Sequence, residues 1–223
     1  MVVLKLFLKK WNWKPLGLTE WLCLSAAFSV LLLMARVLVT GELTYLFLPW
    51  NLFLAFIPLY ITNKMQQDIR LLEKKWLFIV LLLIWILFIP NSFYIITDLF
   101  HLTHIDSAPK WFDLLMIFSF AWNGLILGIL SVRKMELFAS LQFGRPVSHL
   151  FVFVVMWLSA FGIYIGRFLR FNSWDVLANP FSLMSEIGEM ILQPLEHGIA
   201  WGMTVCYAAF MSLVYFTVGK IRG

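Results

Sequence analysis

Long apolar runs separated by short polar stretches make up the chain from about residue 18 onward. Each run holds roughly 20 residues, which is the length that an α-helix needs to cross the hydrocarbon core of a bilayer. A shorter segment starts at Asn179-Pro180 and repeats apolar side chains at helical spacing, which predicts an amphipathic helix on the outer membrane surface. We predict six spans, at residues 18–40, 44–62, 76–97, 111–132, 148–168 and 198–218.

The composition indicates the same class of protein. Hydrophobic residues make up 62% of the chain and charged residues only 13%, which excludes an ordinary soluble domain. Six spans and their connections use most of the 223 residues, so there is no room for a separate soluble domain. We therefore predict an all-α integral membrane protein, in which residues 1–223 form one polytopic domain and the lipid bilayer is the main partner.

Lysine and arginine are distributed unequally between alternate ends of the predicted spans. One side holds three of them, Lys110, Arg167 and Arg170. Because cytoplasmic loops carry the excess of basic residues, this bias places both termini in the cytoplasm. It also explains the net charge of +5, so the charge does not point to nucleic acid as a partner. The other side holds thirteen: Lys5, Lys9, Lys10, Lys14, Lys64, Arg70, Lys74, Lys75, Arg133, Lys134, Arg145, Lys220 and Arg222.

Polar residues close the third predicted span, after Pro90. If the helix resumes after this proline, Asn91, Tyr94, Asp98 and His101 are spaced three, four and three apart and share one face. Asp98 and His101 then suit a general acid/base pair, an oriented imidazole or two metal ligands. The alternative is that these side chains cap helix ends or lie in a solvated loop. The spacing alone does not choose between the two interpretations.

A second group of polar residues ends the fifth predicted span. Tyr164, Arg167 and Arg170 advance three residues at a time, and guanidinium groups bind carboxylate or phosphate. The alternative interpretation is that the arginines reach to lipid headgroups or pair with an aspartate, such as Asp98. Gly162 and Gly166, one helical turn apart, favour close helix packing.

Asp113 begins the fourth predicted span and is a further candidate, because a carboxylate at membrane depth is costly unless it has a partner. We group it with Asp98 and His101 as the candidate catalytic residues. Arg167, Arg170, Tyr94, Asn91 and Tyr164 are the candidate substrate-binding residues. Arg36 and Asn51 are expected to add to the same region.

The motifs around these residues resemble those of an uncharacterised bacterial membrane protein family, domain of unknown function 1361. The resemblance rests on three segments: residues 90–102, residues 111–124 with Trp111, Asp113 and Asn123, and residues 162–175. It implies a helical membrane fold, a location in the bacterial cytoplasmic membrane and a site at the outer ends of the spans. It implies no activity.

Three classes of function remain open. The first is binding or carrying an anionic solute or lipid headgroup, with Asp98 and His101 as a proton-linked switch. The second is an intramembrane hydrolase or transferase acting on a lipid-linked substrate, by metal or by acid/base chemistry. The third is an accessory structural subunit. The metal, cofactors, nucleophile and protein partners are not identified by any pattern in the sequence, so it does not establish whether the protein is an enzyme.

Overall fold

The computed structural model describes residues 17–68, 70–103 and 107–221. Lys5, Lys9, Lys10, Lys14 and Arg222, which enter the orientation argument, lie outside these residues. Every regular element within the described ranges is helical. The elements are α2 (Leu18–Thr40), α3 (Phe47–Gln67), α4 (Arg70–Glu73), α5 (Lys75–Tyr94), the 3-10 helix η1 (Ile95–Thr103), α6 (Lys110–Phe143), α7 (Arg145–Arg167), α8 (Asp175–Ala178), α9 (Pro180–Leu192) and α10 (Gly198–Ile221).

Five stretches of the described chain are long and apolar enough to cross a membrane. They are Leu18–Thr40, Lys75–Leu102, Lys110–Phe143, Leu150–Arg167 and Gly198–Lys220. The predicted count of six is therefore not confirmed. A helix, α3, does overlap the remaining predicted span, but its two prolines and the polar groups of Asn51, Asn63 and Lys64 make it less apolar. Helix α9 also forms, and its position at the outer membrane surface stays a prediction.

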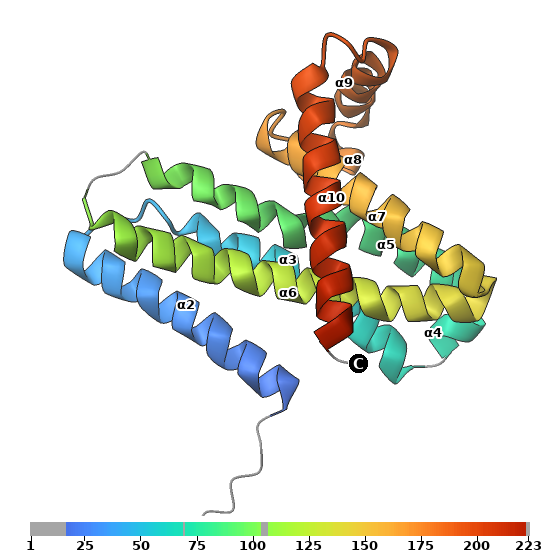
Figure 1. The fold of residues 1–223 in the computed structure, drawn as a ribbon, viewed down its shortest axis with the longest axis horizontal. Coiled ribbons are helices and arrows are strands. Elements are labelled where there is room, and N and C mark those ends of the chain that lie inside the picture. Colours follow the sequence, from blue (N-terminus) through green and yellow to red (C-terminus); the bar gives the residue numbers. More distant parts are fainter. Residues whose placement is uncertain (1–16, 69, 104–106, 222–223) are drawn as a thin grey trace, which may run out of the picture.

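Helix α6 lies at the centre of the molecule. Its most apolar 18-residue stretch is 72% buried, against 17–33% for the other four candidates. It packs against α2, α3, α5, α7 and η1, whereas α10 packs mainly against α7. Figure 1 shows the axes of α2, α3 and α6 roughly aligned, with α10 crossing α6 and α9 beyond the end of α7. The helix continues 11 residues past the predicted end of the span at residue 132.

Polar groups buried between helices are satisfied by neighbouring helices. Trp85 Nε1 donates to Ser131 Oγ at 2.7 Å, and Ser92 Oγ donates to the Ala55 carbonyl at 2.8 Å. Each bond joins α5 to another helix, α6 in the first case and α3 in the second. Such bonds stabilise helix packing where water cannot compete for the polar groups.

Pro90 does not end α5. The α-helix continues to Tyr94, and the chain then tightens into the 3-10 helix η1. From the sequence, we expected the polar residues from Asn91 to His101 to share one face of an α-helix. The structure corrects this expectation, because the change from 3.6 to three residues per turn alters the direction of every side chain after Ile95.

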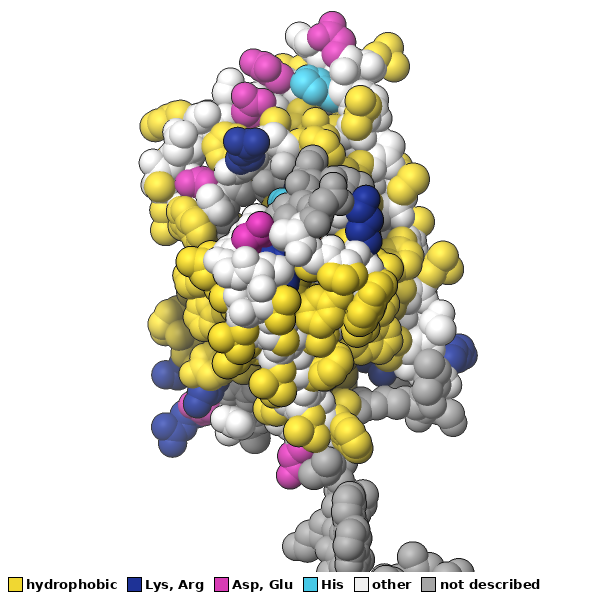
Figure 2. Space-filling model, turned by 90° about the vertical axis from the view of Figure 1, so that its left-hand side faces the viewer, with side chains coloured by type: hydrophobic (Ala, Val, Ile, Leu, Met, Phe, Trp, Pro, Cys, Tyr) yellow, Lys and Arg dark blue, Asp and Glu magenta, His cyan; other side chains and the backbone are white. Residues whose placement is uncertain are grey.

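The outer surface of the molecule is divided by residue type. Figure 2 shows hydrophobic side chains across the middle of one face, with acidic and histidine side chains gathered towards the top and several basic side chains near the bottom. Large apolar side chains are exposed along α2, including Trp21, Leu31 and Leu38. Exposed apolar side chains on a helix of this length fit contact with lipid.

Candidate functional site

A cavity of about 430 Å³ lies between α3, α5, α7 and α9. Most of its wall is apolar, with Leu54, Leu158 and Ile187 among the lining residues. Pro90 also lines it, together with Ile86, whose carbonyl has no proline N–H to accept from. In a membrane such a carbonyl needs a partner from the protein or from water, and the cavity lies beside it.

The polar part of the cavity wall comes from two segments far apart in the sequence. Asn91 Nδ2 donates to Ser173 Oγ at 2.9 Å and to the Phe88 carbonyl at 3.0 Å. Ser173 Oγ in turn donates to the Leu87 carbonyl at 3.0 Å. These bonds hold the segment after α7 against the C-terminal half of α5. The two side chains are thus fixed where they line the cavity.

Two glycines set the separation of α5 and α7 beside the cavity. A Cβ added at Gly162 would lie 2.9 Å from Pro90 Cβ, and one at Gly166 would lie 3.2 Å from the Tyr94 ring. Both distances are shorter than normal contacts, so only glycine allows this approach. The close packing predicted from the glycine spacing is present, and it places Tyr94 in the cavity wall.

A buried charge cluster adjoins the cavity through Asn51. This residue lines the cavity and donates from Nδ2 to Asp98 Oδ2 at 2.8 Å. Asp98 is only 1% exposed, and its other oxygen, Oδ1, faces Arg167 Nη1 at 3.7 Å. That distance is an ion pair but is too long for a hydrogen bond. Within the described residues, Asp98 Oδ1 has no hydrogen-bond partner.

His101 lies on the other side of the Arg167 guanidinium. Arg167 Nη2 is 3.3 Å from His101 Nδ1, which is itself 3.2 Å from the Asp98 carbonyl oxygen. A bond from Arg167 needs a lone pair on Nδ1, whereas a bond to the Asp98 carbonyl oxygen needs a proton there, so a given tautomer satisfies one of the two contacts. The histidine therefore contacts the backbone of Asp98, and the arginine faces its carboxylate. Phe100 and Phe47 pack against Arg167 and His101 respectively.

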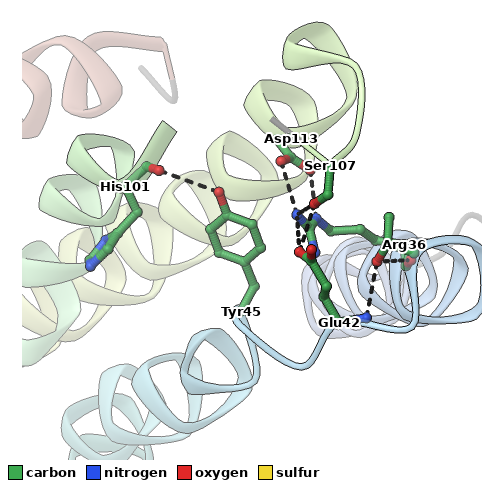
Figure 3. A network of polar contacts seen from close by, with 7 residues as sticks. Arg36, Glu42, Tyr45, His101, Ser107 and Asp113 are labelled. Carbon is green, nitrogen blue, oxygen red and sulfur yellow. Dashed lines mark hydrogen bonds and ion pairs between the residues drawn. The ribbon is translucent and has the colours of Figure 1, made fainter. Parts of the chain in front are cut away.

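A second charge cluster joins α2 to α6 (Figure 3). Arg36 is 1% exposed and donates to Asp113 through Nε at 2.8 Å and Nη2 at 3.4 Å. Nη2 also donates to Ser107 Oγ at 3.0 Å, and Ser107 donates to Glu42 Oε2 at 2.6 Å. Glu42 completes the cluster at 3.6 Å from Arg36. Two carboxylates thus surround one buried guanidinium.

Tyr45 connects the two clusters. Its ring lies under the Arg36 guanidinium at 4.5 Å, and its hydroxyl donates to the His101 carbonyl at 3.3 Å (Figure 3). Tyr45 therefore contacts a side chain of one cluster and the backbone of the other.

The structure separates the residues that the sequence argument grouped. Asp98, His101 and Arg167 come together, with Asn51 as an expected addition. Asn91 and Tyr94 line the adjoining cavity. Asp113 instead pairs with Arg36.

The other two candidates lie apart from these contacts. Tyr164 stacks on Phe168, with ring centroids 5.1 Å apart. Arg170 is exposed and has a left-handed backbone with φ of 60°. Nothing in the geometry assigns either residue to the cavity.

Sequence reasoning missed several cavity residues. Trp50, Phe161, Phe171, Asn172 and Ser173 all line the cavity, and none was a site candidate. Asn172 and Ser173 follow shortly after Arg170, which lies beyond the end of α7, and that polar run was the available signal. The aromatic residues are indistinguishable in sequence from those that face lipid. As for a metal, no group of three His, Cys, Asp or Glu suited to hold one occurs in the described part of the chain.

These features define an all-helical protein with several helices that suit a membrane and with buried charges at one end of them. The chain belongs to the family described as protein of unknown function (DUF1361), whose model matches residues 50–214. The matched region contains the whole cavity lining and the Asp98 cluster, whereas Arg36, Glu42 and Tyr45 precede it. No curated protein and no solved structure matches the chain.

Proposed function

We propose that this protein binds or carries an anionic solute or lipid headgroup in the cavity between α3, α5, α7 and α9. The observation that carries the proposal is the wall of that cavity, where an apolar surface meets amide and hydroxyl groups. Ligand sites usually combine a mostly apolar wall with a few placed polar groups. A molecule with an apolar part and a polar end fits such a wall.

Arg167 is the cation that we assign to the anionic group. It directly follows Gly166, which lines the cavity, and its side chain is 16% exposed. Arg167 Nη1 lies 3.7 Å from Asp98 Oδ1, and these two atoms make no hydrogen bond. The guanidinium therefore keeps N–H donors for a ligand. Asn51 touches both the cavity and Asp98, and therefore connects ligand contacts to the charge pair.

The enzyme alternative has less support from the geometry. It required Asp98, His101 and Asp113 to act on one substrate, but Asp113 is bound to Arg36 in the other cluster. His101 Nδ1 lies 3.2 Å from the Asp98 carbonyl oxygen, whereas the Asp98 carboxylate faces Asn51 and Arg167. A binding function uses the observed Asp98–Arg167 contact directly.

We further propose a topology of six crossings, with α3 as the sixth, in a bacterial cytoplasmic membrane and with both termini in the cytoplasm. The support is the charge bias of the sequence and the length of α3, whose 21 residues suffice for one crossing. Under this topology the cavity lies near the outer surface, and α9 lies over it with Leu183 and Ile187 in its wall. Fusions of a cytoplasm-dependent fluorescent reporter and of a periplasm-dependent phosphatase to the C-terminus test the orientation.

The binding proposal is tested with purified protein in detergent. Phosphatidylglycerol, an anionic lipid, is expected to raise the melting temperature more than zwitterionic phosphatidylcholine with the same acyl chains, because a ligand stabilises the state that binds it. The decisive variant is the double substitution Asp98→Asn with Arg167→Gln, which removes both charges together. It is expected to fold and to lose the preference for the anionic lipid.

A matched control makes the same exchange in the other cluster, with Arg36→Gln and Asp113→Asn. This variant is expected to keep the preference for phosphatidylglycerol, because no member of the Arg36 cluster lines the cavity, whereas the Asp98 cluster reaches its wall through Asn51. Equal stabilisation of the unmodified protein by the two lipids would refute the proposal. If the Asp98/Arg167 variant retained the preference, the assignment of Arg167 to the anionic group would be wrong.

A further inference from the structure

The polar side chains that line the cavity are uncharged. They are the amides of Asn51, Asn91 and Asn172 and the hydroxyls of Ser173 and Tyr94, and no ionised side chain is among the described lining residues. An anion in the cavity itself would need donors from these groups. Their hydrogen bonds within the protein show which of them remain available to a ligand.

Several of the donors in this wall already bond within the protein. Both N–H groups of Asn91 are directed to protein acceptors, the Phe88 carbonyl and Ser173 Oγ. The Ser173 hydroxyl donates to the Leu87 carbonyl. Asn51 Nδ2 donates to Asp98. The amide oxygens Oδ1 of Asn51 and Asn91 have no recorded hydrogen bond among the described residues, so this part of the wall offers acceptors.

Acceptor oxygens favour a ligand that carries hydroxyl groups. A phosphate placed against the two amide oxygens would meet their lone pairs, whereas a hydroxyl group would donate to them. Aromatic side chains of Trp50, Tyr94, Phe161 and Phe171 complete this part of the wall. Flat apolar rings beside amide acceptors suit the C–H faces and the hydroxyls of a polyol or a sugar.

The rest of the wall selects a lipid over a free solute. Leu54, Ile86, Leu158, Ile165, Leu183 and Ile187 supply an apolar surface that a small polar solute would leave unused. An acyl or isoprenoid chain would cover this apolar surface, as ligands of mostly apolar pockets do. The cavity therefore has a separate place for a chain and for a hydroxylated head.

We infer that the ligand is an anionic lipid whose headgroup carries hydroxyl groups, such as a polyol or glycosyl phosphodiester. The hydroxyls donate to Asn51 Oδ1 and Asn91 Oδ1, and the phosphate faces Arg167. This inference rests on the proposed function, because the phosphate uses the same arginine. It adds that charge alone does not select the ligand.

The test compares four compounds that differ in one property at a time. Each competes with tail-labelled fluorescent phosphatidylglycerol for the detergent-solubilised full chain. Phosphatidylglycerol has charge and hydroxyls, phosphatidylmethanol has the charge alone, glucosyl diacylglycerol has hydroxyls alone, and glycerol 1-phosphate lacks the chains. Phosphatidylglycerol is expected to bind about tenfold more tightly than phosphatidylmethanol, since two neutral hydrogen bonds are lost. The other two compounds are expected to compete more weakly still.

The outcomes separate this inference from the proposed function. Equal binding of phosphatidylglycerol and phosphatidylmethanol would overturn the inference and leave anion binding standing. Tight binding of glucosyl diacylglycerol would overturn the anionic part of both, and equal competition by glycerol 1-phosphate would overturn the choice of a lipid. No binding by any of the four would overturn both proposals.

A variant then locates the hydroxyl contact. Asn91→Leu keeps the approximate volume and removes the amide oxygen. It is expected to reduce the difference between phosphatidylglycerol and phosphatidylmethanol, because only the Asn51 oxygen then remains to accept from a hydroxyl. Asn63→Ala is the control, since Asn63 contacts Lys134 and lies outside the cavity wall. It is expected to retain the difference. If Asn91→Leu retains it too, the assignment to Asn91 is wrong, and the lipid comparison on the unmodified chain remains decisive for the inference.

Discussion

Two arginine–aspartate pairs flank Tyr45, and they are built differently. Arg36 and Asp113 are both at most 2% exposed and make two hydrogen bonds. Asp98 is as buried, but Arg167 is partly exposed and the facing atoms are 3.7 Å apart. Ser107 and Glu42 surround the first pair, whereas the second pair adjoins a cavity through Asn51. Arg36 Nη1, like Asp98 Oδ1, has no hydrogen-bond partner within the described residues, so the two pairs differ in burial and in direct bonding. The difference indicates a structural clamp between α2 and α6 in one case and a more open pair beside a cavity in the other.

Breaking the clamp is expected to have the largest effect on stability. Asp113→Ala leaves the Arg36 charge buried beside an exposed Glu42, which should cost about 3–5 kcal/mol of the free energy of unfolding. The measurement is denaturant unfolding in detergent, followed by near-UV circular dichroism. The double variant Arg36→Met with Asp113→Leu should recover most of the loss, because no unpaired charge remains. A single variant as stable as the unmodified protein would show that the pair is not a clamp.

The cavity side should instead be sensitive to helix separation. Gly162→Ala places a methyl group 2.9 Å from the rigid Pro90 ring and is expected to cost about 1–3 kcal/mol. Gly202→Ala in α10 is the control, since nothing lies within 4 Å of its added Cβ. Thermal unfolding of both variants gives the comparison. Equal stability of the two would mean that α5 and α7 are free to move apart.

The open pair should respond more in binding than in stability. Asp98→Asn keeps an acceptor for Asn51 and removes the charge that faces Arg167, so the stability should fall by only about 1 kcal/mol. The freed guanidinium should bind phosphatidylglycerol more tightly, by a factor on the order of ten. Arg167→Gln should change the affinity in the opposite direction. If the affinity for phosphatidylglycerol were unchanged in both variants, the Asp98–Arg167 pair would be a structural clamp like the Arg36–Asp113 pair.

The smallest effect is expected where the two regions meet. Tyr45→Phe removes the hydrogen bond to the His101 carbonyl and keeps the ring under Arg36, which should cost about 0.5–1.5 kcal/mol. Lipid affinity should stay the same, because Tyr45 is not among the cavity residues. A fall in affinity with little loss of stability would show that the two clusters are coupled and do not act independently.

Most of the helices could be expected from the sequence, but their details could not. The first predicted span coincides with α2, and Asn179-Pro180 begins a helix as expected. Helix α6 runs beyond its apolar segment because Lys134 and Gln142 find partners on the α3–α4 side. No pattern in the sequence predicted the 3-10 helix η1 after Tyr94. Hydrophobicity predicts where a lipid-facing helix is stable. It does not predict where a helix continues through polar residues because neighbouring helices bind them.

The sequence by itself determined the helical class, the approximate helix positions and the set of buried charges, because each follows from local hydropathy and from the cost of an ion in an apolar setting. Only the tertiary structure decided which charges meet. Asp113 lies only 15 residues from Asp98 in the chain, yet Asp113 pairs with Arg36 and Asp98 pairs with Arg167. Pairing depends on the packing of whole helices around α6 and on the close approach that Gly162 and Gly166 permit, and neither is encoded in local periodicity.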